Sequence, residues 1–294
     1  MDFDFLNPID DRLLAHNLML PEQVIGRNLL IHTQKDGIPE LTDIRVAMVS
    51  LEPRLVKGEP LHLRFRQQFY QLFAGNWDFA CADLGVLHNG DHPKDTLFAL
   101  KTLVKELHQR NILTIVVGGE QENTLGMFRG LSGMNTYVNL TSIDARLDFG
   151  EPGVLVSDDS YMSKIITEKP NNLKQFTNLG YQSYYVSQEE LDLMQKLFFD
   201  AYRLGDLSAD IHESEPILRD TDILSVDLSS VKASELDHPK GLPNGFDGAQ
   251  ICKLMRYAGL SDRLSVLGVF NISVVKNVTS YYEEEALYRL ERFW

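Results

Sequence analysis

Charged side chains are gathered in one short stretch of this 294-residue chain. Asp144 and Asp148 stand in "TSIDARLDFG", at the end of a segment that is typical of a buried strand, and Arg146 lies between them. Carboxylates at a strand end are typical ligands of divalent cations. An arginine cannot bind a metal, because its guanidinium stays protonated. The stretch therefore indicates either a cation site or a site where Arg146 replaces the cation.

Two further strand ends carry polar side chains of the same kind. "VVGGEQENTLG" follows a β-branched segment with a glycine pair, which allows a tight turn, and then presents Gln121. "LSVDLSS" places Asp227 and Ser229 two residues apart. Residues i, i+2 and i+4 of an extended strand share one face. We therefore expect the three charged residues of "TSIDARLDFG" to point the same way if their strand continues.

These stretches need elements that bring their ends together. Short apolar runs alternate with amphipathic segments, which predicts βαβ units and a mostly parallel sheet. Strands are expected at residues 44–51, 77–85, 112–120, 136–144, 183–187, 223–229 and 264–271. Continuous apolar strands favour a sheet covered on both faces. The predicted fold class is α/β, a single-domain three-layer αβα arrangement in which ligands bind at the carboxyl ends of the strands.

Two amphipathic segments are expected to form covering helices. In "DTLFALKTLVKELHQR" five apolar residues fall on one helical face: Leu97, Leu100, Leu103, Val104 and Leu107. A second helix is expected to begin after Asp247, because Gln250 stands three residues on and completes a capping box. Its apolar face comprises Ile251, Leu254, Met255 and Ala258.

The ends of the chain have weaker patterns. Residues 1–42 have no clean period, and we expect them to form a lead-in packed on a main domain at residues 43–294. The terminal stretch "EEEALYRLERFW" is amphipathic and is expected to form a last helix on the core or a contact surface.

Composition limits the classes of partner. The net charge of -14 disfavours nucleic acid and anionic membrane surfaces. The sequence has no apolar run long enough to span a membrane and no basic leader, so a cytoplasmic location is expected. Cys81 and Cys252 stand in apolar contexts without a CxxC pair, which is typical of thiols in a reducing compartment.

In this order and at these intervals, the three stretches resemble the metal-ligand segments of the ureohydrolase superfamily, which comprises arginase, agmatinase and formimidoylglutamase. Those segments read GGDH, DAHxD and S-x-D-x-D followed by a DP loop. The resemblance covers roughly residues 43–290 and includes "DHP" at 237–239 and "GLPNGFDG" at 241–248. "SDDSYMSKI" and "NLGYQSY" are most similar to the formimidoylglutamase branch. The resemblance implies an arginase-like α/β fold.

The resemblance also implies two manganese ions that activate a water for attack on a guanidino or formimino carbon. Position by position, however, three of the six ligands are replaced in this chain. The two histidines fall on Gln121 and Arg146, and one aspartate falls on Ser229. The three ligand positions that keep a carboxylate are Asp144, Asp148 and Asp227. The family's glutamate, which lies near the cationic nitrogen of the substrate, falls on Val269.

These replacements predict an arginase-like protein that lacks the manganese pair and is catalytically silent, with a binding or regulatory role and no cofactor. The guanidinium of Arg146 is expected to bridge Asp144 and Asp227 in the place of a metal. Alternatively, Arg146 grips the anionic group of a small molecule at the strand ends. The assemblies common in the family also make a homo-oligomer an option.

A second interpretation is an active hydrolase of a linear amidine or guanidino C–N bond. It requires manganese or another divalent cation on Asp144, Asp148 and Asp227.

Overall fold

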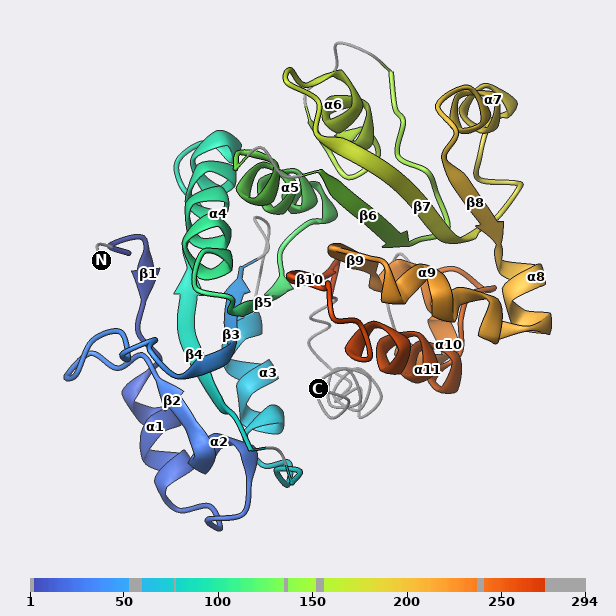
Figure 1. Ribbon diagram of the computed structural model, residues 1–294. Coiled ribbons are helices and arrows are strands. Elements are labelled where there is room, and N and C mark those ends of the chain that lie inside the picture. Colours follow the sequence, from blue (N-terminus) through green and yellow to red (C-terminus); the bar gives the residue numbers. More distant parts are fainter. Residues whose placement is uncertain are drawn as a thin grey trace.

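A mostly parallel sheet forms the centre of the molecule, with helices on either side (Figure 1). The computed structural model describes residues 3–52, 60–76, 78–134, 137–151, 156–236 and 241–272. Within these residues one sheet holds ten strands in the order β1-β4-β3-β5-β10-β9-β6-β7-β8, and β2 also pairs with β4. The strands are β1 (Leu6–Asn7), β2 (Leu29–Ile31), β3 (Ile44–Leu51), β4 (Ala80–Leu87), β5 (Leu113–Gly118), β6 (Val138–Ile143), β7 (Leu173–Tyr181), β8 (Asp200–Arg203), β9 (Ile223–Asp227) and β10 (Val266–Phe270). Strand β1 runs antiparallel to β4, and the pairings among β2 to β10 are parallel.

Helices cover both faces of the sheet, as Figure 1 shows. The helices are α1 (Asp11–Leu18), α2 (Ile25–Asn28), α3 (Leu61–Phe69), α4 (Pro93–His108), α5 (Thr124–Ser132), α6 (Tyr161–Thr167), α7 (Gln188–Lys196), α8 (Leu204–Ala209), α9 (Glu215–Arg219), α10 (Ala233–Leu236) and α11 (Gly248–Gly259), with short 3-10 turns η1 (Gln121–Asn123), η2 (Ile211–Ser214) and η3 (Leu228–Ser230). Helices α4 to α7 share one apolar cluster with the sheet, and α1, α3 and α8 to α11 share another. The predicted three-layer αβα class is confirmed.

The two covering helices that the sequence predicts are both present. The five apolar residues of α4 are buried, as are the four of α11. The capping box of α11 is also formed: Asp247 N–H donates to Gln250 Oε1 at 3.0 Å, and Gln250 N–H donates to Asp247 Oδ1 at 2.8 Å. Local chemistry therefore fixes where this helix begins.

One predicted strand is wrong. Residues 183–187 form a turn, in which Tyr185 N–H donates to the carbonyl of Gln182 at 2.8 Å. The strand in this region is β7, which ends just before that turn. The tyrosines and valine of "SYYVS" favour strands by propensity, but their position in the fold overrides it. Strands β1, β2 and β8 were also not expected from the sequence.

The N-terminal segment adds its strands to one edge of the sheet. Leu6 pairs with Leu87 near the carboxyl end of β4, and Leu29 pairs with Cys81 nearer its start. The outer edge of β4 is therefore covered by two short pieces of chain. The amphipathic stretch at 283–294 lies outside the described residues, as do Trp77 and the "DHP" at 237–239. None of the helices in the described part of the chain is long and apolar enough to cross a membrane.

A buried ion pair ties α3 to the sheet. Arg66 donates from Nε and Nη2 to the two carboxylate oxygens of Asp83, both at 2.7 Å, and neither side chain is exposed. Its remaining N–H groups donate to Ser50 Oγ and to the carbonyl of Gly85, both at 2.8 Å. Tyr70 also donates its hydroxyl to Asp83, at 2.8 Å. Each charge in this group therefore has its partners.

Candidate functional site

Strand register brings the carboxyl ends of β6, β9 and β10 level. Ile143 of β6 pairs with Val226 of β9, so Asp144 lies beside Asp227 in the next row. Asp227 in turn pairs with Phe270 of β10. Neighbouring strands are about 4.8 Å apart, which puts the two carboxylates within strong electrostatic range.

The glycine pair of "VVGGEQE" lets the chain turn at the end of β5. Gly118 has a φ of 92°, and a Cβ there would lie 2.3 Å from the carbonyl oxygen of Leu51. Only glycine fits this position without strain. The turn leads into η1, and it places the buried side chain of Gln121 near Asp144.

The chain after β6 does not continue as a strand. Arg146 N–H donates to Asp144 Oδ1 at 2.8 Å, and Asp148 has a φ of 57° in the left-handed region. Aspartate tolerates that region better than most residues. The expectation that Asp144, Arg146 and Asp148 share a strand face is therefore wrong. Instead the tight turn folds the Asp148 carboxyl back onto Asp144.

Arg146 does not stand in the place of a metal. Its guanidinium carbon lies 4.9 Å from the ring centroid of Tyr185, and its side chain lines a cavity. Within the described residues, no ion pair joins Arg146 to Asp144 or Asp227. The predicted bridge is therefore wrong. The turn uses the backbone N–H of Arg146 on Asp144 and directs the side chain toward the loop after β7.

Three buried carboxyl groups consequently share one small region. Asp144, Asp148 and Asp227 are 2%, 5% and 7% exposed. Burial, and then the charge of Asp227, raises the pKa of Asp144 to about 8. Burial and the neighbouring Asp144 raise the pKa of Asp148 well above its usual range. Burial also raises the pKa of Asp227, to about 6. Ionisation of one of these carboxyl groups therefore disfavours ionisation of its neighbours.

Gln121, Ser229 and Asn271 face the aspartates with hydrogen-bond donors. Ser229 N–H donates to Asp227 Oδ1 at 2.7 Å, and the Ser229 hydroxyl also bonds to Asp227. The side chains of Gln121 and Asn271 donate to Asp144 and Asp227 respectively, and each lowers the pKa of its carboxyl. One oxygen, Asp144 Oδ2, is buried and has no hydrogen-bond partner among the described residues.

Val269, where the resemblance places the family's glutamate, has no part in this group. It is 1% exposed and packs in the apolar cluster beneath α11. No group of three or more His, Cys, Asp and Glu side chains is placed to hold a metal ion in the part of the chain that the structure describes.

Tyr161 is a site residue that the sequence did not reveal. It is fully buried at the start of α6, and its hydroxyl has no well-formed hydrogen bond with a described residue. Burial raises its pKa well above the usual range, and the charges of Asp148, Asp144 and Asp227 raise it further. The only sequence signal was "SDDSYMSKI", which pointed to a family branch and not to a role.

A cavity of about 590 Å³ opens beside the aspartates. Its walls come from the loop after β6, the approach to α6 and the start of α7: Arg146, Asp148, Phe149, Gly150, Glu151, Asp159, Tyr185, Ser187, Glu189, Glu190 and Leu193. Glu190 is already engaged, because it accepts from Ser187 N–H at 2.9 Å and caps α7. Asp148 connects this cavity to the buried carboxyl groups.

One family model matches the chain, and several solved structures share its fold. The arginase family model matches residues 49–233 of the chain. A comparison with curated proteins found no match to the sequence. The three solved structures described next are at most 15% identical in sequence to this chain, so their likeness shows the fold alone.

Three solved structures illustrate that likeness. A variant of Trypanosoma cruzi formiminoglutamase with Mn²⁺ has a TM-score of 0.75 at 13% identity, over 86% of this chain and 93% of that chain. Bacillus subtilis formimidoylglutamase has a TM-score of 0.73 at 11% identity, over 87% and 89% of the two chains. Thermoplasma volcanium agmatine ureohydrolase has a TM-score of 0.70 at 15% identity, over 95% and 97%.

Proposed function

This chain belongs to the arginase family, and we propose that it is a catalytically silent member that binds a small molecule at the carboxyl ends of its strands. Its fold is related to that of formimidoylglutamase. A cytoplasmic location belongs to the same proposal, because Cys81 and Cys252 stand in apolar sequence contexts without a CxxC pair.

One observation carries the proposal: the residues around Asp144 and Asp227 donate hydrogen bonds to them. Metal ions require lone pairs from the surrounding residues, and two Mn²⁺ ions require many of them. Arg146 offers none, Ser229 is used as a donor, and Gln121 turns an N–H toward Asp144. We infer that this donor set does not fit a pair of manganese ions.

The cavity beside the aspartates supports the proposal that the protein binds a small molecule without catalysing a reaction. Arg146 carries a fixed positive charge and has no carboxylate partner among the described residues, so it can receive a carboxylate or phosphate group of a ligand. Its stacking on Tyr185 holds the guanidinium in one orientation. The exposed carboxylates Glu151, Asp159 and Glu189 restrict the other end of that ligand to neutral or cationic groups.

Titration of the purified protein with MnCl₂, together with hydrolysis assays, tests the proposal that it is catalytically silent. We expect less than one tightly bound ion per chain by calorimetry, and no hydrolysis of formimidoylglutamate, agmatine or arginine. The matched control is the triple variant Gln121→His, Arg146→His, Ser229→Asp, which restores the family's ligand types. This variant should bind manganese more tightly than the natural chain, by at least about tenfold.

Two bound ions in the natural chain, with hydrolysis that Asp148→Ala abolishes, would establish the alternative of an active metal-dependent hydrolase. The alternative keeps one observation in its favour, because Asp144 Oδ2 is buried and lacks an N–H partner. A cation could occupy that position in place of a proton.

A further inference from the structure

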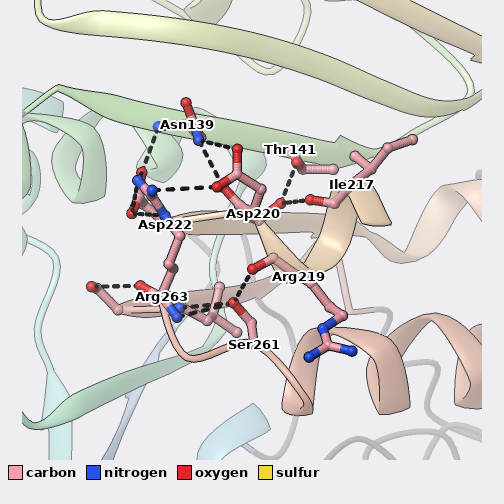
Figure 2. Close-up of polar contacts among 11 residues, drawn as sticks. Asn139, Thr141, Ile217, Arg219, Asp220, Asp222, Ser261 and Arg263 are labelled. Carbon is pink, nitrogen blue, oxygen red and sulfur yellow. Dashed lines mark hydrogen bonds and ion pairs between the residues drawn. The ribbon is translucent and has the colours of Figure 1, made fainter. Parts of the chain in front are cut away.

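The amino ends of the sheet carry a polar cluster far from the candidate site. Figure 2 shows Asp222, just before β9, close to Asn139 at the start of β6 and to Arg263 in the loop that precedes β10. Asn139 N–H donates to Asp222 Oδ2 at 2.7 Å, and Asp222 N–H donates to the carbonyl of Asn139 at 2.9 Å. Asp222 therefore holds β6 through both its side chain and its backbone.

Asp222 holds β10 in the same way. Its carbonyl accepts from Ser265 N–H at 2.9 Å and from Val266 N–H at 3.2 Å. Its carboxylate accepts from Arg263 Nη2 at 3.0 Å and 3.1 Å, and Arg263 also pairs with Asp220 at 3.3 Å. The carboxylate of Asp222 is mostly buried, at 14% exposure, whereas the Arg263 side chain is 42% exposed, so solvent partly screens this ion pair.

The same three strands deliver the polar groups of the candidate site. Asp144 follows Asn139 by five residues, as Asp227 follows Asp222, and Asn271 follows Val266 by five. Five residues of strand span about 17 Å, so the amino-end cluster and the site lie at opposite ends of equal lengths of chain. A shift of one residue in either pairing would turn every side chain of the strand to the other face.

We propose that Asp222 is a positioning residue: by joining the starts of β6, β9 and β10, it sets the register that brings Asp144 level with Asp227. The role does not depend on what the site binds, so it stands whether or not the protein is silent. Arg263 and Asn139 act through Asp222, as its charge partner and its anchor on β6.

Two backbone amides can be used to monitor the geometry of the candidate site, whether or not the protein has an activity. Arg146 N–H and Ser229 N–H donate to the carboxylates of Asp144 and Asp227. In Asp222→Ala we expect both amides to change their NMR signals and to exchange with solvent about tenfold faster. A purely local role would increase exchange only at the amino ends, near Leu140, Ile223 and Val266.

The control is Arg219→Gln, which removes a nearby exposed ion pair with Glu215 and no strand contact. It should leave both reporter amides unchanged. If Asp222→Ala does not fold, Arg263→Gln gives the same test with a smaller expected effect, because it keeps the bonds between Asp222 and Asn139. If the variant that folds loosens the amino ends and leaves Arg146 and Ser229 unaffected, the proposal is wrong.

Discussion

Buried aspartates on and just after the strands of the sheet have two opposite kinds of surroundings. Asp83 is fully buried and is surrounded by the bidentate guanidinium of Arg66, the hydroxyl of Tyr70 and the amide of Gly85. Asp144 and Asp148 are almost as buried, but each other's carboxyl is among their nearest partners. Burial is therefore similar in the two groups, and the difference lies in the supply of positive charge.

A buried carboxylate with a structural role differs from one in a functional site. A carboxylate with a complete set of donors ties elements together, as Asp83 ties β4 to α3. Carboxyl groups that must share protons are costly to keep, and they persist where something other than stability requires them. The arginines differ in the same sense, because Arg66 pairs with an acid and Arg146 stacks on Tyr185.

The largest expected effect is that of Asp83→Asn, which disrupts the buried ion pair between Arg66 and Asp83. This change preserves shape but leaves the charge of Arg66 buried without a partner. We expect the free energy of unfolding to fall by roughly 3 to 5 kcal/mol, measured by urea denaturation. Arg219→Gln, which removes a surface pair, should cost less than about 1 kcal/mol. Equal costs for the two variants would contradict the structural role of Arg66 and Asp83.

An aspartate-to-asparagine substitution among the other aspartates should raise the stability of the protein instead of lowering it. Asp148→Asn removes a carboxyl group whose pKa in the folded protein is raised by burial and by Asp144. Asparagine also tolerates the left-handed backbone at this position. At pH 8 we expect a gain in stability of roughly 1 to 3 kcal/mol relative to the natural protein.

The pH dependence follows from the direction of the pKa shifts. A carboxyl with a raised pKa in the folded state contributes stability that is fully present below its unfolded pKa and is lost as pH rises through the folded value. For Asp144 that window extends from the ordinary 3.8 to about 8. The advantage of Asp148→Asn should therefore shrink toward zero near pH 4, as thermal melting across this range would show. A loss of stability at pH 8 would mean that the aspartates already have a cation.

The smallest expected effect belongs to Arg146→Gln. Because the guanidinium stacks on Tyr185, its loss should cost less than about 1 kcal/mol and should leave the pH dependence of melting unchanged. Tyr185→Phe, which keeps the ring, is the control and should have no effect on stability. A cost like that of Asp83→Asn would show that Arg146 neutralises the aspartates after all.

Much of the fold follows from patterns within single segments. The run at 44–51, which is apolar except for Arg45 and Ser50, corresponds residue for residue to β3, and the capping chemistry at Asp247 marks the start of α11. The carboxyl ends of parallel strands meet at one edge, so the three polar stretches could be brought together from sequence alone.

The features that the sequence did not reveal depend on contacts between segments. Strands β1 and β2 have no period of their own and exist because β4 offers an edge. The direction of Arg146 depends on a backbone turn that ends at Asp148, and no spacing rule predicts it. Tyr161 and Asp222 look ordinary in the sequence, and each is significant only because of what other strands place beside it.

The cover that β1 and β2 provide over β4 has a consequence for solubility. A bare strand edge offers unpaired N–H and C=O groups to any other chain and is a template for aggregation. Cys81 to Asp83 and Val86 to Leu87 pair instead with the N-terminal segment. The first thirty or so residues therefore act as a built-in guard against sheet-to-sheet association between molecules, and a chain that lacked them would present that edge to its neighbours.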